Sequence, residues 1–237
     1  MRWWRRRRGG RRKRRRVLRW TAAVASAFLL LSWLPVLALR WLPPPTTAFM
    51  LLDPDARTDL DYEWTEWAAV GSSLPIAVLA SEDQKFPSHF GFDLESIRDA
   101  IDDSQRGGRL RGASTISQQV AKNLFLWNGR SLVRKGIEAY FTVLIEATWP
   151  KQRILEVYVN IAEFGPGVFG VGAASRRFFA ESPSRIGDAQ AALLAAVLPN
   201  PKRLRADQPS AYVRERQSWI LIQMRRLRRE RVLAALN

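Results

Sequence analysis

Cysteine is absent from this 237-residue chain, and histidine occurs once, as His89. The lack of thiols excludes a cysteine nucleophile and a thiolate-bound metal, and a single imidazole does not make a metal site. We therefore expect a structural role for His89. An extracytoplasmic domain of this size can be stable without disulfides, so the missing cysteines leave the compartment open.

The sequence also shows little that indicates β structure and no internal repeat. No stretch alternates apolar and polar residues along the length of a strand, whereas several segments carry apolar residues at helical spacing. With 47% hydrophobic residues, the chain can bury the core of one domain. We predict a mainly α domain with helices at 73–86, 94–103, 114–125, 131–148, 151–163, 188–199 and 209–236.

Acidic residues are missing from the first 19 residues, which hold 12 of the 38 lysines and arginines. The rest of the chain has 26 basic and 22 acidic residues, so most of the net charge of +16 belongs to this tail. Residues 20–39 then form a run of 20 residues without a charge, about the length that crosses 30 Å of hydrocarbon. A basic tail directly before such a run predicts a cytoplasmic tail beside a membrane and argues against nucleic-acid binding.

These patterns divide the chain into a cytoplasmic basic tail (1–19), a transmembrane anchor (20–42), an extended linker (43–60) and an extracytoplasmic domain (61–237). The linker begins with three consecutive prolines, Pro43 to Pro45. A cleaved signal peptide is the alternative to an anchor. The apolar run is long for a signal peptide, and Arg40 to Pro43 offer no small-residue cleavage site, so we favour the anchor.

Glu82 lies near the end of the first predicted helix of the domain, where one side of it faces the core. Partial loss of hydration raises the pKa of a carboxyl group toward the range that suits a general base or acid. The alternative is a helix-end ion pair with Lys85. Its neighbour Asp83 is a candidate partner for a backbone amide.

Glu138 is accompanied by four cations, Lys122, Arg130, Arg134 and Lys135. Such a group can hold a pyrophosphate, either alone or with a divalent metal such as Mg²⁺ that bridges Glu138 to the phosphates. The alternative is a surface ion pair between Arg134 and Glu138, worth about 0.2–0.5 kcal/mol.

The segment between the two glutamates is rich in hydroxyl and amide side chains. A solvated helix face usually alternates Glu and Lys, whereas hydroxyls and amides side by side suit sugar hydroxyls and phosphate oxygens. The residues of this kind are Ser114, Thr115, Gln118, Gln119 and Asn123.

Four blocks of the sequence together resemble the family 51 glycosyltransferases, the peptidoglycan polymerases, in order and in spacing. The resemblance covers about residues 70–200. The stretch Thr46 to Met50 is similar to the monofunctional Gram-negative members. No lysine is followed by Thr-Gly, so the motifs of a penicillin-binding domain are missing and the polymerase is expected to stand alone. The four blocks are Glu82 to Asp93, Gly112 to Phe125, Arg134 to Glu138 and Lys151 to Asn160.

The resemblance implies a lysozyme-like, two-lobed α domain on the periplasmic side of the cell inner membrane. The implied reaction is polymerisation of lipid II into β-1,4-linked glycan, with inversion and release of undecaprenyl pyrophosphate. Proteins of the division or elongation machinery are candidate partners besides lipid II and the growing glycan.

The resemblance also implies roles for individual residues. Glu82 is the general base that deprotonates the acceptor sugar, and Glu138 is the second catalytic carboxylate, on the donor side. The donor pyrophosphate is held by Lys122, Arg130, Arg134 and Lys135, and the substrate groove contains Asp83, Ser114, Thr115, Gln118, Gln119 and Asn123.

Two other functions remain as alternatives. A lysozyme-like hydrolase would use Glu82 as an acid but has no need of a cation cluster. An inactive scaffold of the cell-wall machinery would not need intact Glu82, Glu138 and Lys122. The basic C-terminal segment is expected to be the solvated face of a packed helix, with binding to anionic lipid as the alternative.

Overall fold

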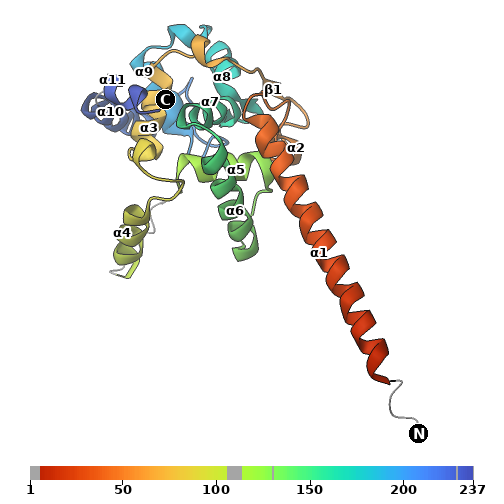
Figure 1. Cartoon of the computed structure of the whole chain (residues 1–237). Helices are drawn as coiled ribbons and strands as arrows, with labels where there is room; N and C mark the ends of the chain where they lie inside the picture. Colours follow the sequence, from red (N-terminus) through yellow and green to blue (C-terminus); the bar gives the residue numbers. More distant parts are fainter. Residues whose placement is uncertain (1–5, 106–113, 130, 228, 237) are drawn as a thin grey trace. The chain divides into compact units, whose positions relative to one another are not determined.

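The computed structural model describes the whole chain except residues 1–5, 106–113, 130, 228 and 237 (Figure 1). It divides into two compact units, residues 1–42 and 43–237. The first unit contains one helix, α1 (Arg6–Leu39). Its part from Lys13 to Leu39 is long and apolar enough to cross a membrane, judged by length and composition. A helix of these 27 residues is about 40 Å long.

The second unit is mainly helical and contains one small sheet. In this sheet β3 lies in the middle, parallel to β1 and antiparallel to β2. Short 3₁₀ turns occur at Trp67–Ala69, Phe86–Ser88 and Pro183–Arg185. The elements are α2 (Ala48–Leu52), β1 (Asp61–Tyr62), α3 (Ser73–Glu82), α4 (Leu94–Gln105), α5 (Ile116–Phe125), α6 (Leu132–Thr148), α7 (Lys151–Ile161), β2 (Glu163–Gly165), β3 (Val168–Phe169), α8 (Gly170–Phe179), α9 (Asp188–Val197), α10 (Ala211–Arg226) and α11 (Arg229–Ala234).

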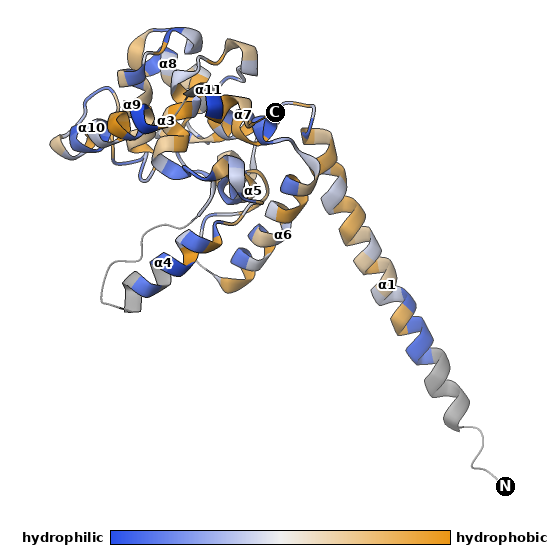
Figure 2. Ribbon diagram, turned by 60° about the vertical axis from the view of Figure 1, so that its left-hand side comes forward, coloured by the Kyte–Doolittle hydropathy of each residue, from blue (hydrophilic) through white to orange (hydrophobic). Residues whose placement is uncertain are grey.

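Helix α3 lies at the centre of the domain. Every residue from Ser73 to Ala80 is buried, and Figure 2 shows hydrophobic residues along this helix. A helix that is apolar all round must be covered on every side. Helices α9 and α10 pack against α3, α7 also contacts it, and α5 packs against α6 and α7. The core therefore joins two groups of helices through α3 and α7.

The predicted extended linker at 43–60 is wrong for residues 48–52, which form α2. The hydroxyl of Thr47 accepts a hydrogen bond from the backbone N–H of Met50 at 3.1 Å and so caps this helix. Met50 is 2% exposed, and α2 packs against α5. The hydrophobic contact makes this segment part of the domain.

Several helix ends also differ from the prediction. The helix predicted from residue 114 begins at Ile116, where the side chain of Thr115 caps α5, and the helix predicted at 188–199 ends at Val197. The helix from 73 ends at Glu82 because Asp83 leaves the helical conformation, with φ −161° and ψ 79°. The helix predicted at 131–148 is observed as α6, and Ser131 caps it by accepting the N–H of Arg134 at 3.1 Å.

The C-terminal segment is two helices and not one, because the backbone turns at Leu227 after α10. The buried side of α10 is formed by Val213, Ile220, Gln223 and Met224. The prediction of a packed helix with a solvated basic face is therefore confirmed for α10, and lipid binding stays an untested alternative.

Two glycines provide a matched test of this backbone. Gly167 has φ +71°, and a Cβ there would overlap the carbonyl oxygen of Asp59. Gly136 lies in α6, and nothing lies within 4 Å of a Cβ placed there. We expect Gly167→Ala to lower the free energy of unfolding by more than about 1 kcal/mol. Gly136→Ala should raise it by up to about 1 kcal/mol. Thermal unfolding of both variants checks this, and equal effects would contradict it.

A candidate active site formed by a half-buried glutamate and a cation cluster

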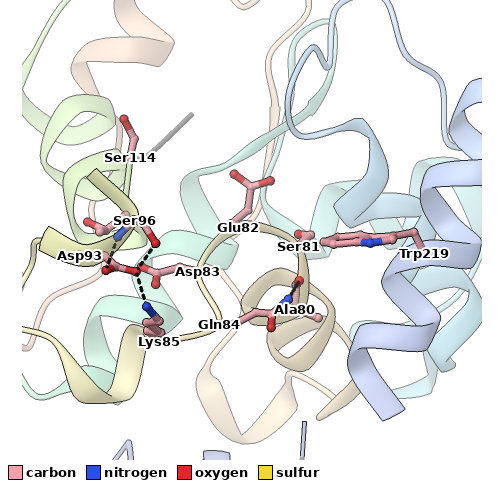
Figure 3. Close-up of a pocket in the computed structure, with 11 residues that line it drawn as sticks. Ala80, Ser81, Glu82, Asp83, Gln84, Lys85, Asp93, Ser96, Ser114 and Trp219 are labelled. Atoms are coloured by element: carbon pink, nitrogen blue, oxygen red, sulfur yellow. Dashed lines mark hydrogen bonds and ion pairs between the residues drawn. The ribbon is translucent and has the colours of Figure 1, made fainter. Parts of the chain in front are cut away.

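Glu82 faces a cavity of about 290 Å³ between the end of α3, the loops on either side of α4, and α10. Figure 3 shows Glu82 between Trp219 on one side and the group of Asp83, Asp93, Ser96 and Ser114 on the other. The last residue of a buried helix thus carries a carboxylate that reaches an open space.

The environment of Glu82 favours its neutral form more than water does. Its side chain is 16% exposed, and this burial raises the pKa of the carboxyl group above its ordinary value. Gln119 opposes the shift, because its Nε2 donates a hydrogen bond to Glu82 Oε2 at 3.0 Å. Arg216 of α10 opposes it too, with Nη2 3.5 Å from Oε1. The result is a carboxylate with raised basicity and defined partners.

The amide of Gln119 is oriented by Tyr158 of α7. The Tyr158 hydroxyl donates a hydrogen bond to Gln119 Oε1 at 3.1 Å, and Tyr158 is 1% exposed. With its oxygen held there, Gln119 presents its NH₂ group to Glu82. This chain of hydrogen bonds fixes the position of the general-base candidate.

Sequence reasoning missed three residues of this site, Tyr158, Arg216 and Trp219. Tyr158 lies in the block from Lys151 to Asn160, which carries the family resemblance as a whole and does not single out this residue. Arg216 and Trp219 lie in the C-terminal segment, where the pattern of charge gave no sign that one arginine faces Glu82. The proposed ion pair between Glu82 and Lys85 is wrong, because Lys85 Nζ lies 2.7 Å from Glu95 Oε2.

Asp83 holds the end of α3 to the start of α5. Its Oδ2 accepts the backbone N–H of Ile116 at 3.0 Å, and both of its oxygens lie 3.0 Å from His89 Nε2. The prediction that Asp83 pairs with a backbone amide is confirmed, and the structural role of His89 stays a prediction. Asp83 also lines the cavity, but these bonds occupy its carboxylate.

The other predicted groove residues divide into two kinds. Thr115 and Gln118 form a capping box at the start of α5, and Thr115 also donates to the carbonyl oxygen of Gly91 at 2.7 Å. Their polar groups are therefore used to build the helix. Ser114 is exposed and lines the cavity, and Asn123 is 8% exposed with an Oδ1 that has no hydrogen-bond partner in the described part of the chain.

Glu138 forms a buried ion cluster on α6. It is 3% exposed, Arg134 Nη1 donates to its Oε2 at 2.7 Å, and Lys135 Nζ donates to its Oε1. The alternative of a surface ion pair is therefore wrong. Arg130 lies outside the described residues.

Lys122 interacts electrostatically with both glutamates. Burial lowers the pKa of its ammonium group, Glu138 and more weakly Glu82 raise it, and Arg134 and Lys135 lower it further. Its Nζ lies 5.3 Å from the centre of the Phe49 ring. No carboxylate of the residues described here forms an ion pair with Lys122, so its charge remains available to an anion.

The contacts of Glu138 do not fit a divalent metal. Both of its oxygens accept hydrogen bonds from cations, and the group of three acidic side chains found within the described ranges lies elsewhere, at Asp53, Asp55 and Glu163. The expectation of Mg²⁺ at Glu138 stays a prediction, and we derive no chemical step through it.

A mainly helical domain that contains a half-buried glutamate with a raised pKa, and a lysine influenced by the charges of both Glu82 and Glu138, is typical of an enzyme. The family model of the transglycosylases matches residues 54–225. The chain belongs to this family. This membership, with the observed elements, confirms the predicted mainly α, lysozyme-like fold.

Three curated relatives are each called biosynthetic peptidoglycan transglycosylase. That of Xanthomonas campestris pv. campestris (strain B100) is 52% identical over 89% of this chain and 88% of its own. That of Stutzerimonas stutzeri (strain A1501) is 54% identical, over 83% of this chain and 84% of its own. That of Pseudomonas entomophila (strain L48) is 54% identical, over 81% and 84%.

We expect Asp83→Asn to lower the free energy of unfolding by about 1–3 kcal/mol, because an NH₂ donor replaces one of the two carboxylate oxygens that contact His89 Nε2, and a neutral oxygen is left to serve both Ile116 and His89. Chemical denaturation measures the change. Asp102→Asn, on the exposed surface of α4, is the control and should have little effect. Unchanged stability combined with weaker substrate binding would instead return Asp83 to the substrate groove.

Proposed function

We propose that this enzyme, a peptidoglycan glycosyltransferase of cell-wall biosynthesis, polymerises lipid II from a membrane anchor. The observation that carries the proposal is the arrangement around α5. Gln119 binds the Glu82 carboxylate, and Lys122, one turn further along, faces the charges of both glutamates. The amide that holds the base for an acceptor hydroxyl and the cation for a leaving phosphate thus lie on one face of α5.

On the acceptor side, Glu82 removes the proton of the 4-hydroxyl of the lipid II sugar. The oxygen forms a bond to C1 of the donor sugar while the bond from C1 to the pyrophosphate oxygen breaks. Attack from the opposite side inverts the α-linkage to a β-1,4 linkage. Burial supports this role, because a carboxylate with a raised pKa is a stronger base than one in water.

On the donor side, Lys122, Arg134 and Lys135, together with Arg130, stabilise the charge that develops on undecaprenyl pyrophosphate as it leaves. Lys122 supports this proposal most directly, since its ammonium group is half-buried and unpaired among the described carboxylates. Glu138 acts through its neighbours: it holds Arg134 and Lys135 in place and is a positioning residue.

A lipid-linked substrate also agrees with the exposed apolar side chains beside this cluster. Trp127, Leu132 and Val133 are 45%, 92% and 72% exposed, close in sequence to the cations of α6. We place this surface at the cell inner membrane, with α1 as the anchor, the basic tail in the cytoplasm and the domain in the periplasm.

The cation cluster argues against the hydrolase, because cleavage of mature glycan produces no phosphate leaving group. An inactive scaffold has no use for a base that Gln119 and Tyr158 hold in position.

We expect no release of muropeptides from purified sacculi by the full chain. Release at a rate comparable to polymerisation would favour the hydrolase.

Glu82→Gln should reduce lipid II polymerisation by the detergent-purified full chain at least about 100-fold, the usual contribution of a general base. Its melting temperature should not fall, because a neutral amide avoids the cost of burying a charge. Glu95→Gln, with a side chain that is 77% exposed, is the matched control and should polymerise normally. Full polymerisation by the Glu82 variant would exclude this residue as the base.

The pH dependence of kcat/KM should report the raised pKa of Glu82. Only the ionised carboxylate accepts a proton, so activity should rise with pH through a pKa above the ordinary value of 4.5. Arg216 lowers this pKa, and Arg216→Gln should therefore move the acid limb to higher pH. An acid limb that does not move would show that Arg216 does not act on Glu82.

A further inference from the structure

Three carboxylates and one ammonium group gather at residues that do not line the Glu82 cavity. Asp53, Asp55 and Glu163 each place one carboxylate oxygen within 4.8 Å of the others. The Nζ of Lys202 lies 2.7 Å from an oxygen of Asp53 and 2.7 Å from an oxygen of Asp55. We call these four residues the Asp53 cluster.

The Asp53 cluster carries more negative than positive charge. When all three carboxylates are ionised, they and the ammonium group leave an excess of two negative charges, the charge that one divalent cation neutralises. The excess is poorly hydrated, because the side chain of Asp53 is 4% exposed and Glu163 is 8% exposed.

Glu163 provides a second, independent observation. Its Oε1 is buried and has no hydrogen-bond partner within the described ranges, although Lys202 is close enough to pair with both aspartates. A buried carboxylate oxygen without a partner is costly, and structures normally satisfy such an atom with a donor, a water molecule or an ion. Here the unpaired oxygen belongs to a carboxylate that already faces two others.

We propose that the Asp53 cluster binds a hard divalent cation, Ca²⁺ or Mg²⁺, through Asp53, Asp55 and Glu163. Such ions take carboxylate oxygens, and Ca²⁺–O distances of about 2.3–2.6 Å allow two ligand atoms to lie up to about 5 Å apart. Asp55 and Lys202 have side chains that are 46% and 37% exposed. Water can therefore complete the coordination from the open side, and the lysine can turn outward as the ion enters.

The backbone already holds the ligands together. Asp53 is the C-cap of α2, and its Oδ1 accepts the N–H of Asp55 at 2.8 Å. Glu163 is the first residue of β2. In the turn after β2, the carbonyl oxygen of Gly167 accepts a hydrogen bond from the backbone N–H of Asp61 at 2.9 Å, which ties this turn to the segment that follows Asp55. A cation would therefore join two segments that are far apart in the sequence, 53–55 and the start of β2, and would hold α2, whose Phe49 covers Lys122.

Cation binding to the folded chain should raise its melting temperature. The full chain in detergent, first treated with EDTA and dialysed, is heated with CaCl₂, with MgCl₂ or with KCl at equal ionic strength. One of the divalent salts should raise the melting temperature by about 3–6 °C at ten times its dissociation constant, while KCl should not. The absence of a shift with both divalent salts would overturn the proposal.

Two variants of the cluster should change binding in opposite directions, as measured by isothermal titration. Glu163→Gln removes a ligand charge and should weaken binding at least about tenfold. Lys202→Gln removes the competing ammonium group and should strengthen it. An ion-pair network with no cation site predicts instead that Lys202→Gln is destabilised and that no divalent salt restores it.

Glu138→Gln separates this site from the donor side of the groove. Its cation-dependent shift should equal that of the unchanged chain, because Glu138 does not belong to the Asp53 cluster. A shift lost in Glu138→Gln and kept in Glu163→Gln would overturn the proposal and place the cation at the donor side. Loss of polymerisation has no bearing on this result, so this inference and the proposed function can fail independently.

Discussion

The hydrogen bond from the backbone N–H of Ile116 to the carboxylate of Asp83 joins the end of α3 to the start of α5. The general-base candidate is the last residue of α3, and its amide partner lies in the first turns of α5. The same carboxylate also binds His89, so it is held from two sides. Because α3 is buried along most of its length, this bond fixes α5 relative to the core of the domain.

Burial acts differently on the two glutamates. Glu82 has a nearby amide and a guanidinium 3.5 Å away, so desolvation dominates and its pKa rises. Glu138 is buried more deeply but is paired with Arg134 and Lys135, which supply the charge that water no longer solvates. In the proposed function the first carboxylate accepts a proton, whereas the second pairs with Arg134 and Lys135 and holds them in place.

The Asp53 cluster contrasts with both sites. There the carboxylates outnumber the nearby cation, and one buried oxygen of Glu163 has no partner. At Glu138 the cations outnumber the carboxylate, which suits an anionic ligand, whereas the excess at the Asp53 cluster suits a cationic one. Helix α2 connects the two regions, since Asp53 ends it and its Phe49 packs over Lys122.

The helices, the apolar span and the pairing of Glu138 with its neighbours on α6 can be predicted from the sequence alone. These features depend on neighbours three or four residues apart, so the spacing of Arg134 and Glu138, or the cap at Ser131, can be predicted from a pattern. Three contacts of the site follow from the packing of the domain: Lys85 pairs with Glu95, Arg216 faces Glu82 and Tyr158 orients Gln119. The last two contacts join residues far apart in the sequence, and all three depend on how the segments pack, which helical periodicity does not specify.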